Sequence, residues 1–163
     1  MTFTYRLATS QDLENIWNKN IADNPKDERW VHWKEEYIGY NKTSMAQTFV
    51  VACMDEPIGE CTLILSPECN AVRGRLELTD GKTVANINAL RIAGEYEGQG
   101  HISKLMACVE VYAKEQGIKS LTIGVEAKET RNLAIYLHWG YDTFVMSETE
   151  EEDLILYYKK ELQ

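Results

Sequence analysis

The sequence predicts an α/β protein of the α+β type, with a mixed, mostly antiparallel sheet of about six to seven strands and helices on both faces. Three observations lead to this fold class. Strand patterns follow one another early in the chain, an amphipathic helix emerges from a glycine-rich turn, and strand and helix patterns alternate after it. The 163 residues contain no repeat or linker, so a single domain over 1–163 is expected.

The first half begins with a strand and two helices. A short strand is expected over 5–8, and the stretch from Thr9 to Asp12 has a capping-box pattern that predicts a helix start. A second helix over about 27–40 follows a turn that contains a proline. Two apolar runs over 47–65, separated by Asp-Glu-Pro, then predict an antiparallel hairpin.

The second half begins with an irregular stretch. Residues 66–82 contain one proline and two glycines, which predict a loop or a further hairpin. A strand over 83–92 leads into a glycine-rich loop and a helix that Gly117 ends. The remaining elements are a strand over 119–126, a short helix over about 130–139, and strands over 141–146 and 154–160. We interpret the acidic run 148–153 as a solvated turn.

The charge balance limits the partners of the chain. The chain has 17 Lys and Arg residues and 26 Asp and Glu residues. The resulting net charge of -9 opposes the phosphate attraction that dominates nucleic-acid binding. We therefore expect a small-molecule partner, cationic or neutral, and no nucleic acid.

Neither an export signal nor a membrane span is evident. The amino terminus lacks a basic flank followed by an apolar run, and no run of about eighteen apolar residues occurs. We expect a cytoplasmic protein without a membrane partner, and the sequence leaves a homodimer open. The cysteines have no paired close spacing, which predicts reduced thiols and no metal site. They are Cys53, Cys61, Cys69 and Cys108.

Glycines mark the joint between the strand over 83–92 and the next helix. Gly98 and Gly100 precede a helix start, whose unpaired N–H groups and positive dipole end favour an anion such as a diphosphate. The simpler interpretation is a tight turn without a ligand. The Walker spacing is absent. A dinucleotide-binding loop would need a glycine at Ser103, although Glu126 lies where a ribose contact is expected.

A recognisable motif surrounds these glycines. It comprises residues 90–92 (Leu-Arg-Ile), the loop over 96–100 and the helix that follows. These residues resemble the coenzyme A motif of the GNAT N-acetyltransferases, with Gly100 at the central glycine. Two positions differ from the family pattern, because Glu97 stands at the usual Arg or Gln and Ile102 at the usual Gly or Ala.

A second motif lies nearer the carboxyl end. Within residues 129–141, Tyr136 stands four residues ahead of a Gly-Tyr pair, in a pattern similar to a helix of the same family. Glu129 and Asn132 replace the commoner Asn and Ala. The order of the two motifs extends the resemblance over nearly the whole chain, and it implies a GNAT-like fold.

The resemblance also implies a function. It implies transfer of the acetyl group of acetyl-CoA to a primary amine of a small cationic molecule, by direct attack in a ternary complex. Tyr136 would protonate the departing thiolate, or its ring would only pack in the core. Lys104, His101 and Arg131 are candidates to offset the charge of Glu97. The residues assigned to the cofactor by resemblance are Leu90, Arg91, Ile92, Gly98, Gln99, Gly100, His101, Ile102 and Ser103.

The proton acceptor is not assigned by the sequence. Some relatives carry a glutamate on the strand before the loop, where this chain has Asn86 and Asn88. Glu60 and Glu126 are substitutes, and each also fits an ordinary charged residue. The missing glutamate keeps open a coenzyme-A-binding protein without catalysis. The paired glycines keep open a dinucleotide-binding oxidoreductase.

An aromatic stripe runs along the second helix. Its residues recur near helical spacing, which predicts a core face. The resemblance implies that this helix also helps to form a wall of the acceptor site, where aromatic faces would suit a cation. The stripe consists of Trp30, Trp33, Tyr37 and Tyr40.

Overall fold

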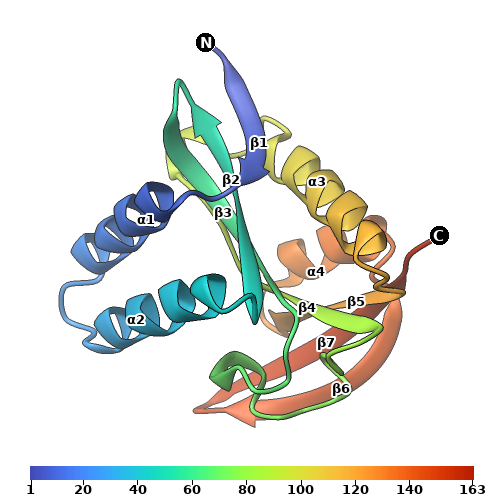
Figure 1. Ribbon diagram of the computed structural model, residues 1–163. Helices are drawn as coiled ribbons and strands as arrows, with labels where there is room; N and C mark the ends of the chain where they lie inside the picture. Colours follow the sequence, from blue (N-terminus) through green and yellow to red (C-terminus); the bar gives the residue numbers. More distant parts are fainter. The chain divides into compact units, whose positions relative to one another are not determined.

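The computed structural model describes residues 1–163 and contains seven strands and four α-helices (Figure 1). The strands are β1 (Phe3–Leu7), β2 (Ala46–Cys53), β3 (Glu56–Ile64), β4 (Val84–Ile92), β5 (Ser120–Glu126), β6 (Thr143–Glu150) and β7 (Asp153–Glu161). The helices are α1 (Ser10–Asp23), α2 (Arg29–Lys42), α3 (His101–Glu115) and α4 (Thr130–His138). The strand order β1-β2-β3-β4-β5-β7-β6, with β4 parallel to β5, confirms the predicted mixed sheet.

The chain forms two compact units. The first unit comprises Met1–Leu63 and Ala89–Val111, and the second comprises Ile64–Asn88 and Tyr112–Gln163. Strand β4 is therefore divided: its residues up to Asn88 belong to the second unit, and those from Ala89 belong to the first. The expectation of a single domain stays a prediction.

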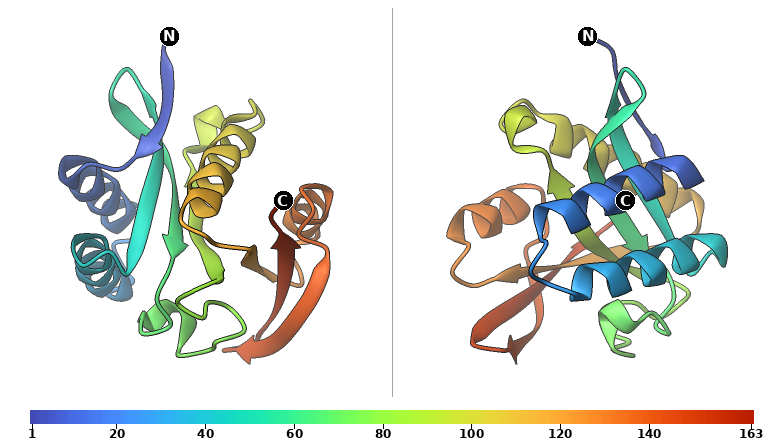
Figure 2. Two further views of the ribbon diagram at one scale, coloured as in Figure 1. Left: turned by 45° about the vertical axis from the view of Figure 1, so that its right-hand side comes forward. Right: turned by 90° about the vertical axis from the view of Figure 1, so that its left-hand side faces the viewer.

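In the first unit, helices cover both faces of a small sheet. Strand β1 is antiparallel to β2, with Phe3 opposite Cys53 and Leu7 opposite Phe49. Helices α1 and α2 lie on one face of β1, β2 and β3, and α3 lies on the other (Figure 2). This arrangement agrees with the expected helices on both faces. Its core includes Leu13, Trp17, Phe49, Val50, Leu63, Leu105 and Val109.

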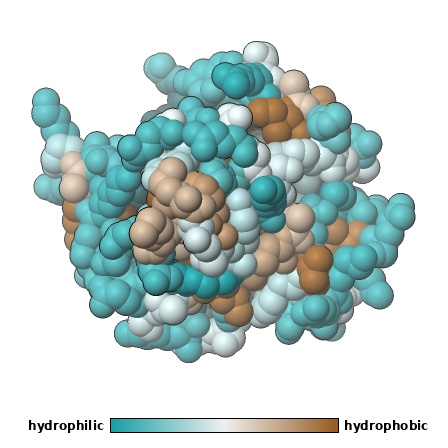
Figure 3. Space-filling model, turned by 90° about the horizontal axis from the view of Figure 1, so that it is seen from above, coloured by the Kyte–Doolittle hydropathy of each residue, from teal (hydrophilic) through white to brown (hydrophobic).

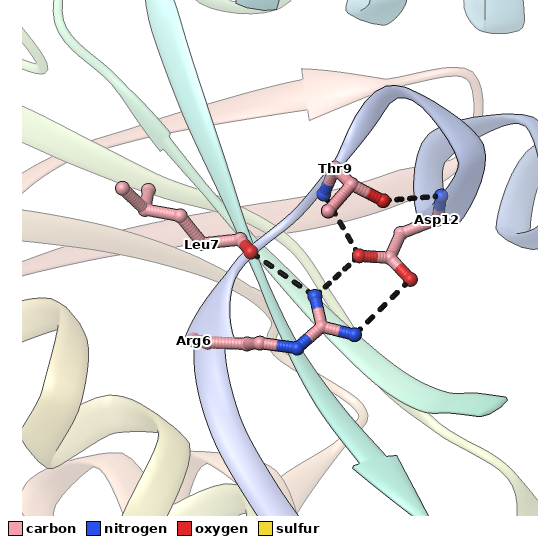
Figure 4. Close-up of polar contacts among 4 residues, drawn as sticks. All are labelled: Arg6, Leu7, Thr9 and Asp12. Carbon is pink, nitrogen blue, oxygen red and sulfur yellow. Dashed lines mark hydrogen bonds and ion pairs between the residues drawn. The ribbon is translucent and has the colours of Figure 1, made fainter. Parts of the chain in front are cut away.

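The start of α1 is fixed by reciprocal hydrogen bonds (Figure 4). The N–H of Asp12 donates to Thr9 Oγ1 at 3.1 Å, and the N–H of Thr9 donates to Asp12 Oδ2 at 2.8 Å. These bonds form the predicted capping box. Arg6 adds an ion pair to the same carboxylate, so β1 and α1 are held together at their junction.

The β2–β3 hairpin turns earlier than the sequence suggested. Met54 and Asp55 form a two-residue loop with φ of 50° and 72°, and β3 already begins at Glu56. Positive φ at both central residues matches the twist of a hairpin. Pro57 lies near the start of its strand, a position that tolerates the missing N–H. The predicted turn over Asp-Glu-Pro was therefore displaced.

The second unit is built on β5. The first half of β4 pairs with it in parallel, with Val84 opposite Ser120 and Ile87 opposite Ile123. Strand β7 pairs with β5 on the other side, and β6 pairs antiparallel with β7. The predicted sequence of strand, helix and parallel strand is confirmed. Its buried apolar residues include Leu78, Ala85, Ile87, Leu121, Ile123, Val125, Tyr141 and Tyr157.

Residues 66–82 form no strand, so the alternative of a further hairpin was wrong. Side chains bond the backbone here instead. Thr79 Oγ1 donates to the carbonyls of Leu65 and Val84, and the carboxylate of Asp80 accepts N–H groups of the residues that follow it. Such local bonds replace a strand ladder.

The interpretation of the acidic run as a solvated turn was also wrong in part. Its first three residues belong to β6, and only Glu151 and Glu152 form the turn. Glu148 is half-buried, pairs with Arg75 and accepts a hydrogen bond from Tyr157 Oη at 2.7 Å. An ion pair from a distant loop therefore draws this carboxylate into the structure.

The cysteines and the helices bear on the expected reduced thiols and the expected absence of a membrane span. All four cysteines are free thiols, and three of them are buried. No helix is both long and apolar enough to cross a membrane. The face seen in Figure 3 is mostly hydrophilic, and its hydrophobic residues form small separate patches.

Candidate active site

The loop before α3 leaves backbone donors open. Gly98 and Gly100 adopt φ of 74° and 84°, and a Cβ at either would meet nothing within 4 Å. The first helical bond runs from the N–H of Lys104 to the carbonyl of Gly100 at 3.2 Å. The N–H groups of Ile102 and Ser103, the two residues before Lys104, donate to no protein acceptor. Exposed glycines and unpaired donors at a helix head form a cradle that fits a diphosphate.

The side chain of His101 serves the fold rather than the loop. It is 6% exposed, and its Nδ1 lies 2.8 Å from Tyr5 Oη. Its ring centre lies 4.3 Å from that of Phe3, and Nε2 has no partner. Only the backbone of His101 is therefore placed to contribute to the cradle.

The charged residues that the sequence offered for or against anion binding are solvent-exposed. Glu97 is exposed, so its carboxylate can turn away from a bound anion. Lys104 is exposed one turn into α3, within the first unit. Arg131 is also exposed and belongs to the second unit. Ile102 is half-buried.

The second half of β4 has an irregular backbone. Ala89 has φ of 51°, which is unfavourable for a residue with a Cβ. The parallel register with β5 ends before it, at Ile87. The residues expected to hold the pantetheine arm, Leu90 to Ile92, follow directly and are half-buried. Backbone strain of this kind tends to occur at functional positions.

A cavity of about 550 Å³ opens in the first unit beside the end of β4. Its walls come from α1, the amino end of α2, the start of β3 and residues 91–95. Trp30 of the aromatic stripe lines it, whereas Tyr37 and Tyr40 are buried core residues. The core interpretation is therefore confirmed for Tyr37 and Tyr40, and a part of the stripe in an acceptor site stays a prediction.

Glu60 is buried against this cavity. Its Oε2 accepts hydrogen bonds from Asn20 Nδ2 and Arg91 Nη1, each at 3.1 Å, and its Oε1 has no partner. Burial raises the pKa of Glu60, and the opposing effects of Arg91 and Asn20 do not cancel this rise. The sequence offered Glu60 only as a substitute for the proton-accepting glutamate of some relatives. No residue near Glu60 in the sequence indicated that Arg91 is its partner.

The two asparagines of β4 form a neutral polar chain. Asn88 donates to Asn86 Oδ1 at 3.2 Å, and Asn86 donates to Thr122 Oγ1 at 3.0 Å. Thr122 in turn donates to the carbonyl of Leu78 at 2.7 Å. The side chain of Glu126 reaches the surface, and its Oε2 lies 3.5 Å from Lys128 Nζ. Neither asparagine can act as a base, and Glu126 has the environment of an ordinary surface ion pair.

Tyr136 lies on α4 in the second unit. It is half-buried, and its ring centre lies 5.8 Å from that of Trp139. Its carbonyl accepts the N–H of Tyr141 at 3.0 Å, across a turn in which Gly140 has φ of 97°. The Gly-Tyr pair of the second motif thus ends the helix.

A family comparison identifies this combination of motifs. The model of the acetyltransferase (GNAT) family matches residues 7–141. The chain belongs to this family. The resemblance seen in the sequence is thereby confirmed, and with it an acyltransferase whose cofactor is acetyl-CoA. The dinucleotide-binding oxidoreductase is excluded.

Solved GNAT structures share the fold at low sequence identity. An N-acetyltransferase from Staphylococcus aureus Mu50 has a TM-score of 0.73 at 13% identity, with both chains covered at 100%. The PaiA N-acetyltransferase from Thermoplasma acidophilum, in complex with coenzyme A, has a TM-score of 0.63 at 18% identity, covering 98% of this chain and 99% of that one.

A spermidine N-acetyltransferase chimera, from Vibrio cholerae and hSSAT, has a TM-score of 0.70 at 18% identity, covering 99% of this chain and 96% of that one. No match was found among curated proteins. These comparisons support the GNAT fold.

Proposed function

We propose that this GNAT acetyltransferase modifies a primary amine of a small cationic molecule, by direct attack in a ternary complex. The observation that carries the proposal is the acidic cavity of the first unit. Its lining includes Asp23, Glu56 and Glu95, in addition to the paired Glu60 and Arg91, and only Lys19 opposes them. Carboxylates attract an ammonium group. The net charge of -9 acts in the same direction.

The chain's residues would hold the cofactor mainly through the backbone. The glycines and free N–H groups from Gly98 to Ser103 would bind the diphosphate. The backbone of Leu90 to Ile92 would align the pantetheine arm beside the strained Ala89. Acetyl-CoA supplies the activated thioester. Fixing its position reduces the entropy cost of the reaction.

Tyr136 is proposed as the general acid. Its phenol hydroxyl would donate a proton to the thiolate as the carbon–sulfur bond breaks. Its position ahead of the Gly-Tyr pair supports this role, as in the family motif. The ring contact with Trp139 explains how the side chain is held.

A second candidate function is binding of coenzyme A without transfer. It is favoured by the hydrogen-bonded Asn86 and Asn88, which offer no base, and by Glu97 at the loop. The two candidates differ in thiol release, because only an active transferase frees coenzyme A in the presence of an amine.

The test is a thiol-release assay over amine classes, run beside a calorimetric titration with acetyl-CoA. The panel holds polyamines, basic amino acids, aminoglycosides and a peptide amino terminus. Amine-dependent release supports the proposed function. Saturable binding of acetyl-CoA without release from any amine selects the second candidate. Absence of binding at millimolar acetyl-CoA would reject the proposed cradle.

A further inference from the structure

An arginine in contact with two tryptophans lines the cavity of the first unit. The Cζ of Arg91 lies 4.9 Å from the ring centre of Trp30 and 5.4 Å from that of Trp17. Its side chain is 35% exposed, although three aromatic and polar neighbours enclose it. Cation–π contact with two indole rings limits where the guanidinium can lie.

Glu60 fixes the remaining freedom of this guanidinium. One donor of Arg91, Nη1, binds Glu60 Oε2 at 3.1 Å, and Asn20 holds the same oxygen from the other side. The Glu60 side chain is only 4% exposed. A buried ion pair is costly and adds little net stability, so its presence beside a cavity indicates a positioning role. Glu60 is the residue that positions Arg91.

The rest of the guanidinium is available to a ligand. Its other N–H groups bond no protein atom. They form part of a planar fork that matches the two oxygens of a carboxylate. A bare ammonium group would be repelled at this point of the cavity, because the charge of Arg91 lies there.

The remaining charges of the cavity have the opposite sign. Apart from the Glu60–Arg91 pair, the lining carries the carboxylates of Asp23, Glu56 and Glu95 against the ammonium of Lys19. A guest with one carboxylate and more than one ammonium group would match both regions. The volume of about 550 Å³ is within the range of small-molecule sites.

We propose that the acceptor is a small amine that also bears a carboxylate, a diamino acid being the simplest example, and that Arg91 binds this carboxylate. The proposal rests on the proposed function and narrows its substrate class. Arg91 thereby becomes a specificity-determining residue through its side chain, separate from the backbone role that it shares with Leu90 and Ile92.

The experiment compares amines that differ only in the carboxylate. Thiol release is measured with lysine against cadaverine, ornithine against putrescine, and arginine against agmatine. We expect kcat/KM to be roughly 10- to 100-fold higher for the amino acid of each pair, which is the size of a charge-assisted hydrogen bond. The difference should lie in KM. Arg91→Met should reduce this ratio to about one, and Arg91→Lys should recover part of it because the charge remains.

The outcomes separate this inference from the proposed function. Equal or better use of the decarboxylated amines would overturn the inference while leaving amine acetylation intact. If no amine releases coenzyme A, the proposed function fails, and titration of lysine and cadaverine into the wild-type protein decides the inference. Tighter binding of lysine that is lost in Arg91→Met supports it, and equal or absent binding overturns it. Circular dichroism of each variant checks that the fold persists.

Discussion

Tyr5 Oη lies 2.8 Å from Nδ1 of His101, so a side chain of the first strand holds the residue that opens α3. The rings of Phe3 and Tyr96 lie around the same imidazole. The side chain of His101 is thus engaged with β1, while the N–H groups of Ile102 and Ser103 have no protein partners. The head of α3 is thereby positioned before any anion binds, which lowers the cost of ordering it.

Replacing Gly100 with alanine should weaken acetyl-CoA binding. Gly100 has φ of 84°, a conformation that costs an L-residue with a Cβ about 1–2 kcal/mol. Gly117, at the other end of α3, has the same φ of 84° and equally open surroundings. We expect both variants to lose similar stability in urea unfolding. Only Gly100→Ala should raise the calorimetric Kd for acetyl-CoA, and an equal Kd in the two variants would contradict the cradle.

Local patterns predicted the elements well because their signals are local. Thr9 and Asp12 lie three residues apart and form the capping box that the sequence indicated. Gly117, with its positive φ, ends α3 as expected. The predicted hairpin turn was misplaced because proline is typical of turns, whereas Pro57 lies near the start of β3, where its missing N–H is tolerated.

Contacts between residues far apart in the sequence could not be predicted in the same way. Arg91 meets Glu60 from 31 positions away and Trp17 from the first helix. Arg75 meets Glu148 from 73 positions away. These partners are brought together by strand pairing and helix packing, and no periodicity in the sequence encodes them. The family motif located the loop and Tyr136, but it assigned only a backbone role to Arg91.

Replacing Tyr136 with phenylalanine should lower turnover. The ring contact with Trp139 is kept, so the fold should persist, while the proposed proton donor is removed. We expect kcat to fall roughly 10²–10⁴-fold with little change in the Kd for acetyl-CoA. Tyr158→Phe is the matched control, because Tyr158 is also half-buried and its ring centre lies 5.8 Å from that of Phe144. Equal turnover in the two variants would remove the role of Tyr136.

Asp12→Asn should destabilise the protein at neutral pH and do so less in acid. Burial alone would raise the pKa of Asp12, but hydrogen bonds from Arg6 and Thr9 outweigh it and lower the pKa. A carboxylate with a lowered pKa stabilises the fold above its unfolded pKa of about 3.9, and this contribution is lost as pH falls through the folded value. We expect a loss of about 1–2 kcal/mol at pH 7, because the hydrogen bonds from Arg6 and Thr9 would no longer be made to a charged group. Urea unfolding should show the wild type and variant converging below pH 4; a constant difference would contradict the pKa shift.

Glu60→Gln should show the opposite pH dependence. Burial raises the pKa of Glu60 in the folded protein, and Arg91 and Asn20 offset only part of this effect. A raised carboxyl pKa gives stability that is fully present below the unfolded value of about 4.3 and is lost as pH rises through the folded value. The wild type should therefore lose stability relative to Glu60→Gln as pH rises from 4 toward 8. Paired urea titrations across this range measure the difference. If the wild type instead gains on the variant over this range, then Arg91 outweighs the burial of Glu60, and the carboxylate is charged at lower pH than its environment indicates.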